Sequence, residues 1–171
     1  SIEWLKEDQA PVDFINGFIE VYGDPLAYKA SWESVVEIVD QEAGERTRKL
    51  AGEALWFEQH APIREEFKKQ EVKGITARVM QVAMLGGDCH PATPIGINLP
   101  NAEWIRERYG SKSVTLDNIT YAYDMAAKSS GMIDEFAGSD EEIRLAREWG
   151  TIGSNVHTDL HECLGHGSGK M

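Results

Sequence analysis

The sequence predicts an α+β fold, and three observations support this class. Extended runs rich in aromatic and β-branched residues occupy 13–22, 32–39 and 75–85. Segments of good helix formers lie between and after these runs. The two kinds of segment do not alternate as regular βαβ units would require, and the sequence contains no internal repeat or low-complexity segment.

The first two strands are expected at 13–22 and 32–39. In the first, aromatic and β-branched residues stand at roughly every second position, and a Gly-Asp-Pro turn at 23–25 ends the run. The second run has a similar composition. We expect the two to form either a hairpin or a pair of neighbouring strands, with a connection too long for a tight turn.

A helix and a third strand are expected next. Helix formers fill 41–60, and Pro62 interrupts them. The run at 75–85 is apolar and β-branched at its start, and the Gly-Gly-Asp sequence at 86–88 predicts a turn after it.

The stretch 91–100 is rich in Pro and Gly and contains a short apolar insert at 95–99. This composition predicts extended backbone that something approaches closely, because a glycine leaves room for a ligand. Helices are then expected over 104–108, with Asn101 as the cap, and over 117–128.

The C-terminal part of the chain is expected to be helical. Ser139 and Glu142 have the spacing of a capping box that opens a further helix. Gly150 and Gly153 then punctuate the sequence. The stretch 155–165 must again be helical if the histidines at its end are to converge on one ion.

The composition excludes several classes of protein. The chain carries 17 basic and 29 acidic side chains, a formal charge of −12, which argues against nucleic acid as a partner. No apolar run approaches the roughly 20 residues of a transmembrane helix, so no membrane partner is expected. The acidic balance also suits a substrate with a positive charge, such as the free amino terminus of a peptide.

Cys89 and Cys163 are the two cysteines, a number compatible with a reducing compartment, and we expect a cytoplasmic protein. The sequence begins at Ser1 and stops at Met171, immediately after a histidine motif. We therefore expect it to be an excised fragment of a longer protein.

His161, Glu162 and His166 form the pattern of a metal site. A catalytic zinc takes three protein ligands and leaves a position for water, and imidazole is a common ligand. We therefore expect His161 and His166 to bind Zn²⁺. The metal lowers the pKa of its bound water to about 7, so a neighbouring carboxylate can accept the proton, and Glu162 is the expected general base.

The two histidines are five positions apart, whereas the commoner His-Glu-x-x-His motif has a spacing of four. At 3.6 residues per turn, five steps leave the side chains roughly 140° apart on a regular helix. A one-residue widening, a π-bulge, would return both to one face, and Gly165 eases it. The alternatives are that the histidines are unrelated polar residues at a helix end, or that His157, four residues before His161, forms the metal pair.

The string His-Glu-Cys-Leu-Gly-His-Gly-Ser-Gly-Lys at 161–170 closely resembles the signature of the dipeptidyl peptidase III family of zinc metallopeptidases. Two further segments support the resemblance: 20–25 is similar to the family's Glu-Ser-Tyr-Arg-Asp-Pro, and 96–101 to its Gly-Ile-Asn-Ile-Pro-Asn. The sequence departs from the family where Cys163 replaces a usual Leu and Gly23 a usual Arg.

The resemblance implies a fragment of a two-lobed metallopeptidase, with a cleft between a mixed β-rich lobe and a helical zinc lobe. On this basis 1–40 and 73–130 are expected to belong to the mixed lobe, and the second of these ranges to carry the substrate-binding loop. The ranges 41–72 and 131–171 are expected to belong to the helical zinc lobe, with the His-Glu-x-x-Gly-His motif in the latter.

The resemblance also implies an exopeptidase that releases dipeptides from the N-terminus of short peptides. Tyr22 would hydrogen-bond the carbonyl under attack. The residues expected to bind the substrate and its free ammonium are Glu20, Glu33, Asn98 and Asn101. From the sequence alone, Tyr22 would equally suit a strand, Asn98 a turn and Asn101 a helix cap.

The family's third zinc ligand is a glutamate that lies beyond the last residue of this sequence. We expect the remainder of the parent chain to supply it, and we expect the fragment alone to be inactive. The rival hypothesis is a non-catalytic metal- or peptide-binding module that retains the motif, although such a module would not need Glu162.

Overall fold

A five-stranded mixed sheet lies at the centre of the computed structural model, which describes residues 2–7, 9–18, 24–26, 28–72, 75–90, 93–100, 102–166 and 169. The strands are β1 (Val12–Phe18), β2 (Trp32–Val39), β3 (Ile75–Gly87), β4 (Gly96–Leu99) and β5 (Ser111–Leu116), in the spatial order β1-β2-β3-β5-β4. β3 and β5 run parallel, and the other neighbouring pairs are antiparallel.

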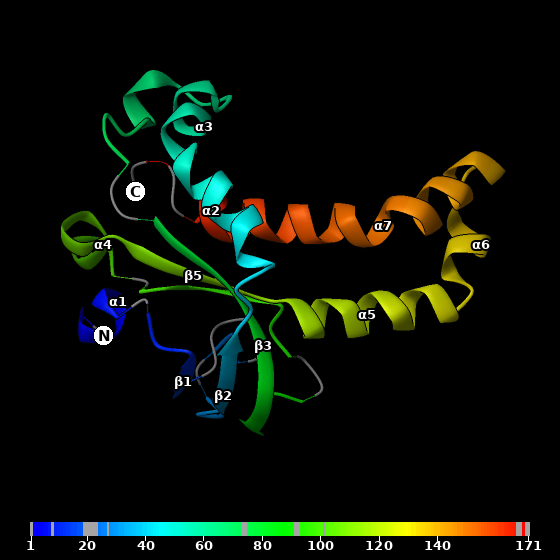
Figure 1. Cartoon of the computed structure of the whole chain (residues 1–171), viewed down its shortest axis with the longest axis horizontal. Helices are drawn as coiled ribbons and strands as arrows, with labels where there is room; N and C mark the ends of the chain where they lie inside the picture. Colours follow the sequence, from blue (N-terminus) through cyan, green and yellow to red (C-terminus); the bar gives the residue numbers. More distant parts are fainter. Residues whose placement is uncertain are drawn as a thin grey trace.

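Helices complete the mixed architecture and confirm the predicted α+β class. They are α1 (Ile2–Lys6), α2 (Gly44–Gly52), α3 (Ala54–His60), α4 (Glu103–Tyr109), α5 (Asp117–Ser129), α6 (Met132–Phe136) and α7 (Asp140–Leu160), with a 3₁₀ turn at Glu65–Phe67 and a π-helical turn at His161–Gly165. Figure 1 shows α2 and α3 on one side of the sheet, while α5 and α7 extend away from it and are joined by α6. Within the described residues, we find no helix with the length and apolar character of a membrane span.

The observed strands confirm the predicted runs, with shifts at their ends. β2 has the predicted bounds. It pairs antiparallel with β1, which is the pairing of a hairpin, one of the two expected arrangements. β1 ends at Phe18, and the remaining residues predicted to continue it, 19–22, lie outside the described part of the chain.

β3 extends through the glycines that were predicted to form a turn. Gly87 has a φ of +66°, and a Cβ there would lie 2.1 Å from the Trp32 carbonyl oxygen. The Asp88 N–H then donates to the same carbonyl at 2.6 Å. The glycine therefore lets β3 stay paired with β2 until its last residue, and the turn begins one position later.

β5 was not predicted from the sequence. Four of its six residues are polar, namely Ser111, Lys112, Ser113 and Thr115, yet all six are buried. Strands flank β5 on both edges, and its two faces are both covered. The N-terminal segment covers Lys112, and the π-helical turn covers Ser113.

The helix predicted over 41–60 consists of two helices, because Glu53 leaves the helical conformation with φ −97° and ψ 10°. The cap of α4 is also not the predicted one. Ala102 occupies the N-cap position and provides no side-chain hydrogen bond, and Asn101 lies outside the described residues.

α7 begins at the predicted capping sequence. The Ser139 hydroxyl accepts from the Glu142 N–H at 3.3 Å, which is the first half of a capping box. The Glu142 carboxylate accepts from the Gly138 N–H at 2.7 Å, one residue before the cap. The helix then continues unbroken through Gly150 and Gly153, so these glycines do not punctuate it as expected.

Two hydrophobic clusters lie on opposite faces of the sheet, because their β3 members Ala77 and Met80 are an odd number of positions apart. One cluster packs the π-helical turn against α3 and consists of Ala54, Cys163 and Leu164, with Phe57, Val72, Ala77 and Leu160 around it. The other packs α5 and consists of Met80, Val114 and Leu116, with Val39, Val82, Ile97 and Ile119 around it.

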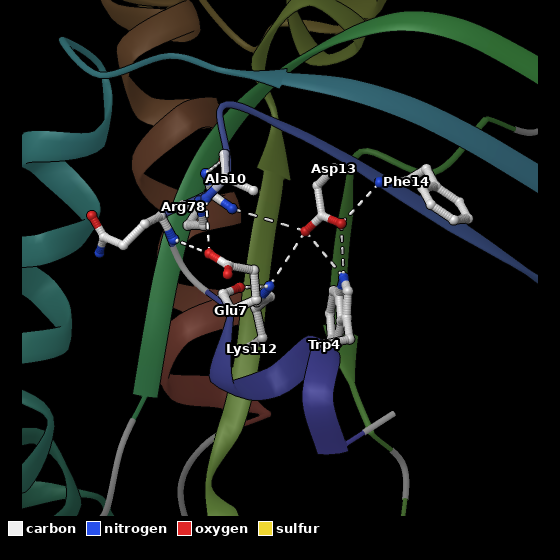
Figure 2. Close-up of polar contacts among 8 residues, drawn as sticks. Trp4, Glu7, Ala10, Asp13, Phe14, Arg78 and Lys112 are labelled. Carbon is white, nitrogen blue, oxygen red and sulfur yellow. Dashed lines mark hydrogen bonds and ion pairs between the residues drawn. The ribbon is translucent and has the colours of Figure 1, made fainter.

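Buried charges fasten the N-terminal segment to the sheet (Figure 2). The Lys112 ammonium donates to the Glu7 carbonyl at 2.5 Å and lies 3.3 Å from the Asp13 carboxylate. It also lies 4.2 Å from the centre of the Trp4 ring, at cation–π distance. The lysine is fully buried, and these three groups offset the loss of its hydration.

Arg78 and Glu37 complete this buried charge cluster, which we define as Asp13, Glu37, Arg78 and Lys112. Arg78 donates to the Ala10 carbonyl, and its guanidinium lies 3.9 Å from the Asp13 carboxylate. Glu37 is fully buried and pairs with Asp13 across β1 and β2. Burial, together with the charge of Asp13, raises the pKa of Glu37 to about 7.

Candidate active site

The turn that follows α7 has the widened form that the histidine spacing predicted. Residues His161–Gly165 are π-helical, and the His166 N–H donates to the His161 carbonyl, five residues back, at 3.0 Å. The two imidazoles therefore lie together, with ring centroids 4.7 Å apart and planes at 84°. A π-helical turn thus removes the roughly 140° divergence of a regular helix.

His161, Glu162 and His166 form a group that can hold a metal ion, since one ligand atom from each lies within 4.8 Å of the others. Two nitrogens bound to one tetrahedral zinc at 2.0–2.1 Å would lie about 3.4 Å apart, so a small ring movement suffices. The Glu162 carboxylate lies 4.0 Å from Nε2 of His161 and 3.9 Å from Nε2 of His166. It is 7% exposed, whereas the imidazoles are 57% and 47% exposed.

Because of this difference in exposure, the imidazoles and the carboxylate are suited to different chemical roles. The imidazoles face solvent, where an ion and a ligand can reach them. The carboxylate lies in a nearly dry environment beside them, where electrostatic interactions are stronger than in water. The arrangement suits two metal ligands and a base that acts next to the metal.

Cys163 lies on the opposite side of the turn and takes no part in this chemistry. It is fully buried against Ala54, and burial raises the pKa of its thiol to about 12. The thiol therefore remains protonated at neutral pH and acts as a small apolar side chain that anchors the turn.

Gly96 provides the space that the Glu162 carboxylate occupies. A Cβ on Gly96 would lie 2.4 Å from Glu162 Oε1 and 2.6 Å from Cδ and Cγ. The sequence predicted that something approaches this glycine closely. The group that does so is the Glu162 side chain from the motif itself.

An ion-pair network holds the end of α7 to neighbouring helices. Asp159, almost fully buried, accepts a hydrogen bond from the Arg46 guanidinium of α2. The same guanidinium lies 3.6 Å from Asp117, the first residue of α5. Burial raises the pKa of Asp117, and the charge of Arg46 opposes that shift. The three residues are far apart in the sequence, so no local pattern could have identified this network.

A second anchor holds the chain after the motif. Glu58 of α3 is fully buried, and its carboxylate accepts from the Gly169 N–H at 2.9 Å and the Lys69 N–H at 2.7 Å. It therefore fixes the backbone three residues after His166. Sequence reasoning missed Glu58, because an acidic residue in a helix usually faces solvent.

The structure brings one of the predicted substrate-binding residues to the motif. Asn98 is 8% exposed, and its amide donates to the Ser113 hydroxyl at 2.7 Å and to the Glu162 carbonyl at 3.3 Å. Glu33 lies at the opposite end of the sheet, since it pairs with Gly87 at the end of β3, ten residues beyond Ala77.

The other predicted residues are Glu20, Tyr22 and Asn101, and all three lie outside the described part of the chain. His157, the alternative metal ligand, is exposed on the last turn of α7. Among the described residues it does not belong to the metal-ligating group.

The sequence matches the profile of peptidase family M49 over residues 1–171. It is 31% identical over 168 residues to "Dipeptidyl peptidase 3" of Dictyostelium discoideum and 29% identical over 171 residues to that of Nematostella vectensis. These matches cover 98% and 100% of this chain but 23% and 22% of those proteins. The chain therefore spans less than a quarter of the length of the curated relatives it matches.

The fold is also similar to a solved structure, that of DPP III from Caldithrix abyssi. The TM-score is 0.76 and the identity 29%, over 98% of this chain and 31% of that one.

Proposed function

The chain belongs to peptidase family M49, and from this premise we propose that it is part of a zinc-dependent exopeptidase that releases dipeptides from the N-terminus of short peptides. The observation that carries the proposal is the convergence of His161, Glu162 and His166 on one π-helical turn. Relatives named dipeptidyl peptidase 3 support the same activity. Because those relatives are more than four times as long, the activity is proposed for the whole protein.

His161 and His166 are the proposed zinc ligands, and the remainder of the longer protein is proposed to supply the third. The fit is supported by two solvent-facing imidazoles, which are suitable ligands for this ion, beside a carboxylate that remains available as a base. Bound zinc supplies a Lewis acid that polarises the scissile carbonyl and acidifies water.

Glu162 is the proposed general base. Its carboxylate takes a proton from the attacking water and returns it to the amine that leaves. Its burial beneath the imidazoles supports this role, because a fixed carboxylate needs little reorganisation during the reaction. Tyr22 is proposed to donate a hydrogen bond to the carbonyl oxygen as charge develops there.

The substrate is proposed to be a short peptide with a free amino terminus. Recognition of its ammonium is assigned to Glu20, Asn98 and Asn101, because a desolvated cation requires carboxylate and amide oxygens. Glu33, the fourth residue expected from the resemblance, lies at the opposite end of the sheet from Asn98 and is not assigned to this pocket. For Asn98, the amide N–H groups are used within the protein, so its side-chain oxygen is the proposed acceptor. The charge of −12 is compatible with a cationic substrate and supports the absence of nucleic acid as a partner.

The whole enzyme is proposed to be cytoplasmic and two-lobed. In this proposal 1–40 and 73–130 contribute to a mixed lobe, and 41–72 and 131–171 to a helical zinc lobe. The packing of α2, α3 and the π-helical turn on one face of the sheet is compatible with this division.

The test is Glu162→Gln in the full-length protein. The variant removes the base and keeps both histidines, so kcat should fall by about 10²- to 10⁴-fold while zinc content is unchanged. Dipeptide release from peptides with free and with acetylated amino termini is measured together with zinc by elemental analysis. Turnover within tenfold of the unaltered protein would refute the role of Glu162. Zinc binding without any release of dipeptides by the unaltered protein would favour a non-catalytic metal- or peptide-binding module.

A further inference from the structure

The π-helical turn changes the partner of one backbone carbonyl. In an α-helix, the Glu162 carbonyl would accept from the His166 N–H, four residues later. Here the His166 N–H donates to His161, and the Glu162 carbonyl accepts from two side chains of the sheet. The Ser113 hydroxyl donates to it at 2.6 Å, and the Asn98 amide donates at 3.3 Å.

The three groups form a closed hydrogen-bonded set. Asn98 donates to the Ser113 oxygen at 2.7 Å, and Ser113 donates onward to the Glu162 carbonyl. Ser113 is 1% exposed, so water cannot easily replace the carbonyl as its acceptor. The hydroxyl therefore favours the backbone geometry that presents the Glu162 carbonyl to it.

The side chains that hold the carbonyl stand on a rigid support. Ser113 lies on β5, where its backbone is paired with Ala77 of β3 on one edge and with Asn98 of β4 on the other. Gly96 lies two residues before Asn98 and so faces the same side of the sheet. One strand face thus holds the Glu162 carbonyl and also makes room for the Glu162 carboxylate.

We propose that Ser113, assisted by Asn98, is a positioning residue that holds the metal-binding turn in its π-helical form. The alternative form is a regular α-helix, in which the Glu162 carbonyl recovers the His166 N–H and the two imidazoles diverge. Ser113 opposes that form by bonding the carbonyl that the α-helix would use. This inference rests on the proposed zinc site, and it adds a residue outside the histidine motif that controls metal affinity.

The experiment compares Ser113→Ala with Ser111→Ala in the full-length protein. Ser111 lies two residues earlier on the same face of β5 and is also buried, but its described contact is a 3.5 Å bond from Asn98, with none to Glu162. The two variants remove the same atom from neighbouring sites. Zinc affinity is measured by competition with a chelator, together with kcat, KM and the unfolding midpoint of the metal-free protein.

Ser113→Ala is expected to weaken zinc binding about 10- to 100-fold, the range seen when groups that orient metal ligands are removed. At saturating zinc, kcat should fall while KM stays within about threefold. Ser111→Ala should leave zinc affinity and kcat within about threefold of the unaltered protein. The metal-free unfolding midpoint should fall more for Ser113→Ala, since that hydroxyl has two short hydrogen bonds whereas the Ser111 hydroxyl has one of 3.5 Å.

Equal zinc affinities for the two variants would overturn the role of Ser113 and leave the proposed function intact, provided the unaltered protein binds zinc and releases dipeptides. A lower metal-free unfolding midpoint for Ser113→Ala with unchanged zinc affinity would also overturn it, because Ser113 would then only stabilise the fold. Absence of zinc binding by the unaltered protein would overturn the proposed function and this inference together.

Discussion

The Glu162 carboxylate occupies space that exists because residue 96 has no side chain. The distances from a Cβ at this position, 2.4–2.6 Å to three atoms of Glu162, are too short for the carboxylate to remain where it is. Gly96 therefore matters for the position of the Glu162 carboxylate because it lacks a side chain, and not because of its backbone conformation.

We predict that Gly96→Ala in the full-length protein lowers kcat by about 10²-fold, the cost of misplacing a catalytic group by roughly 1 Å. Zinc content should remain unchanged, because the three atoms nearest the new methyl group all belong to Glu162 and none to the histidines. Gly17→Ala is the matched control, since a Cβ there meets nothing within 4 Å. An unchanged kcat for Gly96→Ala would show that the carboxylate has a second productive position.

Glu37 gives the protein a titration near neutral pH. Its folded pKa of about 7 exceeds the ordinary value of 4.5, mainly because burial disfavours the charged form. Asp13 raises the pKa further, and the charges of Arg78 and Lys112 lower it. The contribution of the neutral Glu37 carboxyl to the free energy of unfolding is fully present below about pH 4.5 and is lost as the pH rises through about 7.

We predict that Glu37→Gln reduces this loss, because an amide cannot ionise. The change between pH 5 and pH 8 should be smaller than in the unaltered protein by up to about 3 kcal/mol. Unfolding midpoints at the two pH values provide the measurement, and Glu135→Gln, on the exposed surface of α6, is the control. A difference between Glu37→Gln and the unaltered protein that is the same at both pH values would contradict the assignment.

At the level of elements, α3 fixes the chain on the far side of the motif. Glu58 holds the backbone at Gly169 and at Lys69, so one carboxylate joins α3, the segment after the 3₁₀ turn and the residues after His166. The turn that carries the histidines is thus held before it by Asp159 and after it by Glu58.

We predict that Glu58→Ala destabilises the fold by about 1–3 kcal/mol, because it leaves backbone N–H groups without their acceptor. Zinc affinity should also fall, since the chain after His166 loses its anchor. Thermal unfolding and zinc competition are measured on the full-length protein. Glu53→Ala, at the exposed residue between α2 and α3, should change neither quantity appreciably. Loss of stability with unchanged zinc affinity would limit Glu58 to a structural role.

The elements that could be predicted are those whose environment is apolar or whose chemistry restricts the backbone. β2 and β3 have apolar, β-branched sequences, and the π-helical turn followed from the requirement that two histidines five residues apart meet. β5 was not predicted from the sequence, because its polar residues are buried by partners from distant parts of the chain. The break at Glu53 directly follows Gly52, a weak helix former, but a single glycine does not decide where a helix ends, because α7 continues through Gly150 and Gly153.

For the molecule as a whole, the question is which part of the metal site this chain contains. Among the described residues, the metal-ligating group offers two imidazoles and one buried carboxylate. In the proposed function the carboxylate serves the reaction, so the described residues supply two of the three ligands that a catalytic zinc requires.

We predict that the 171-residue chain alone binds zinc at least about tenfold more weakly than the full-length protein and releases no dipeptides. Zinc titration of both forms, with His161→Ala in each as the control for site-specific binding, tests this. Equal affinity and equal activity would show that the third ligand is within the chain, and His157 would be the next residue to replace.

The proximity of the candidate site residues could be predicted where they form one continuous motif, and it could not where they come from distant strands. His161, Glu162 and His166 belong to one π-helical turn and its C-cap, so their spacing alone predicts that they lie together. Ser113 and Gly96 contact Glu162 from two strands of the sheet, and nothing in the local sequence links them to the motif.

The π-helical turn also sets the rotation about the helix axis, and the rise along it, at which the following residues lie. It is equivalent to one residue inserted into an α-helix, or about 100° of rotation and 1.5 Å of rise. Deleting one residue between His161 and His166 would restore the four-residue spacing of an ordinary helix, but it would leave Gly169 one position short of its bond to Glu58. The four- and five-residue histidine spacings are therefore not interchangeable in this fold, because the insertion lies between the paired imidazoles on one side and the anchor at Glu58 on the other.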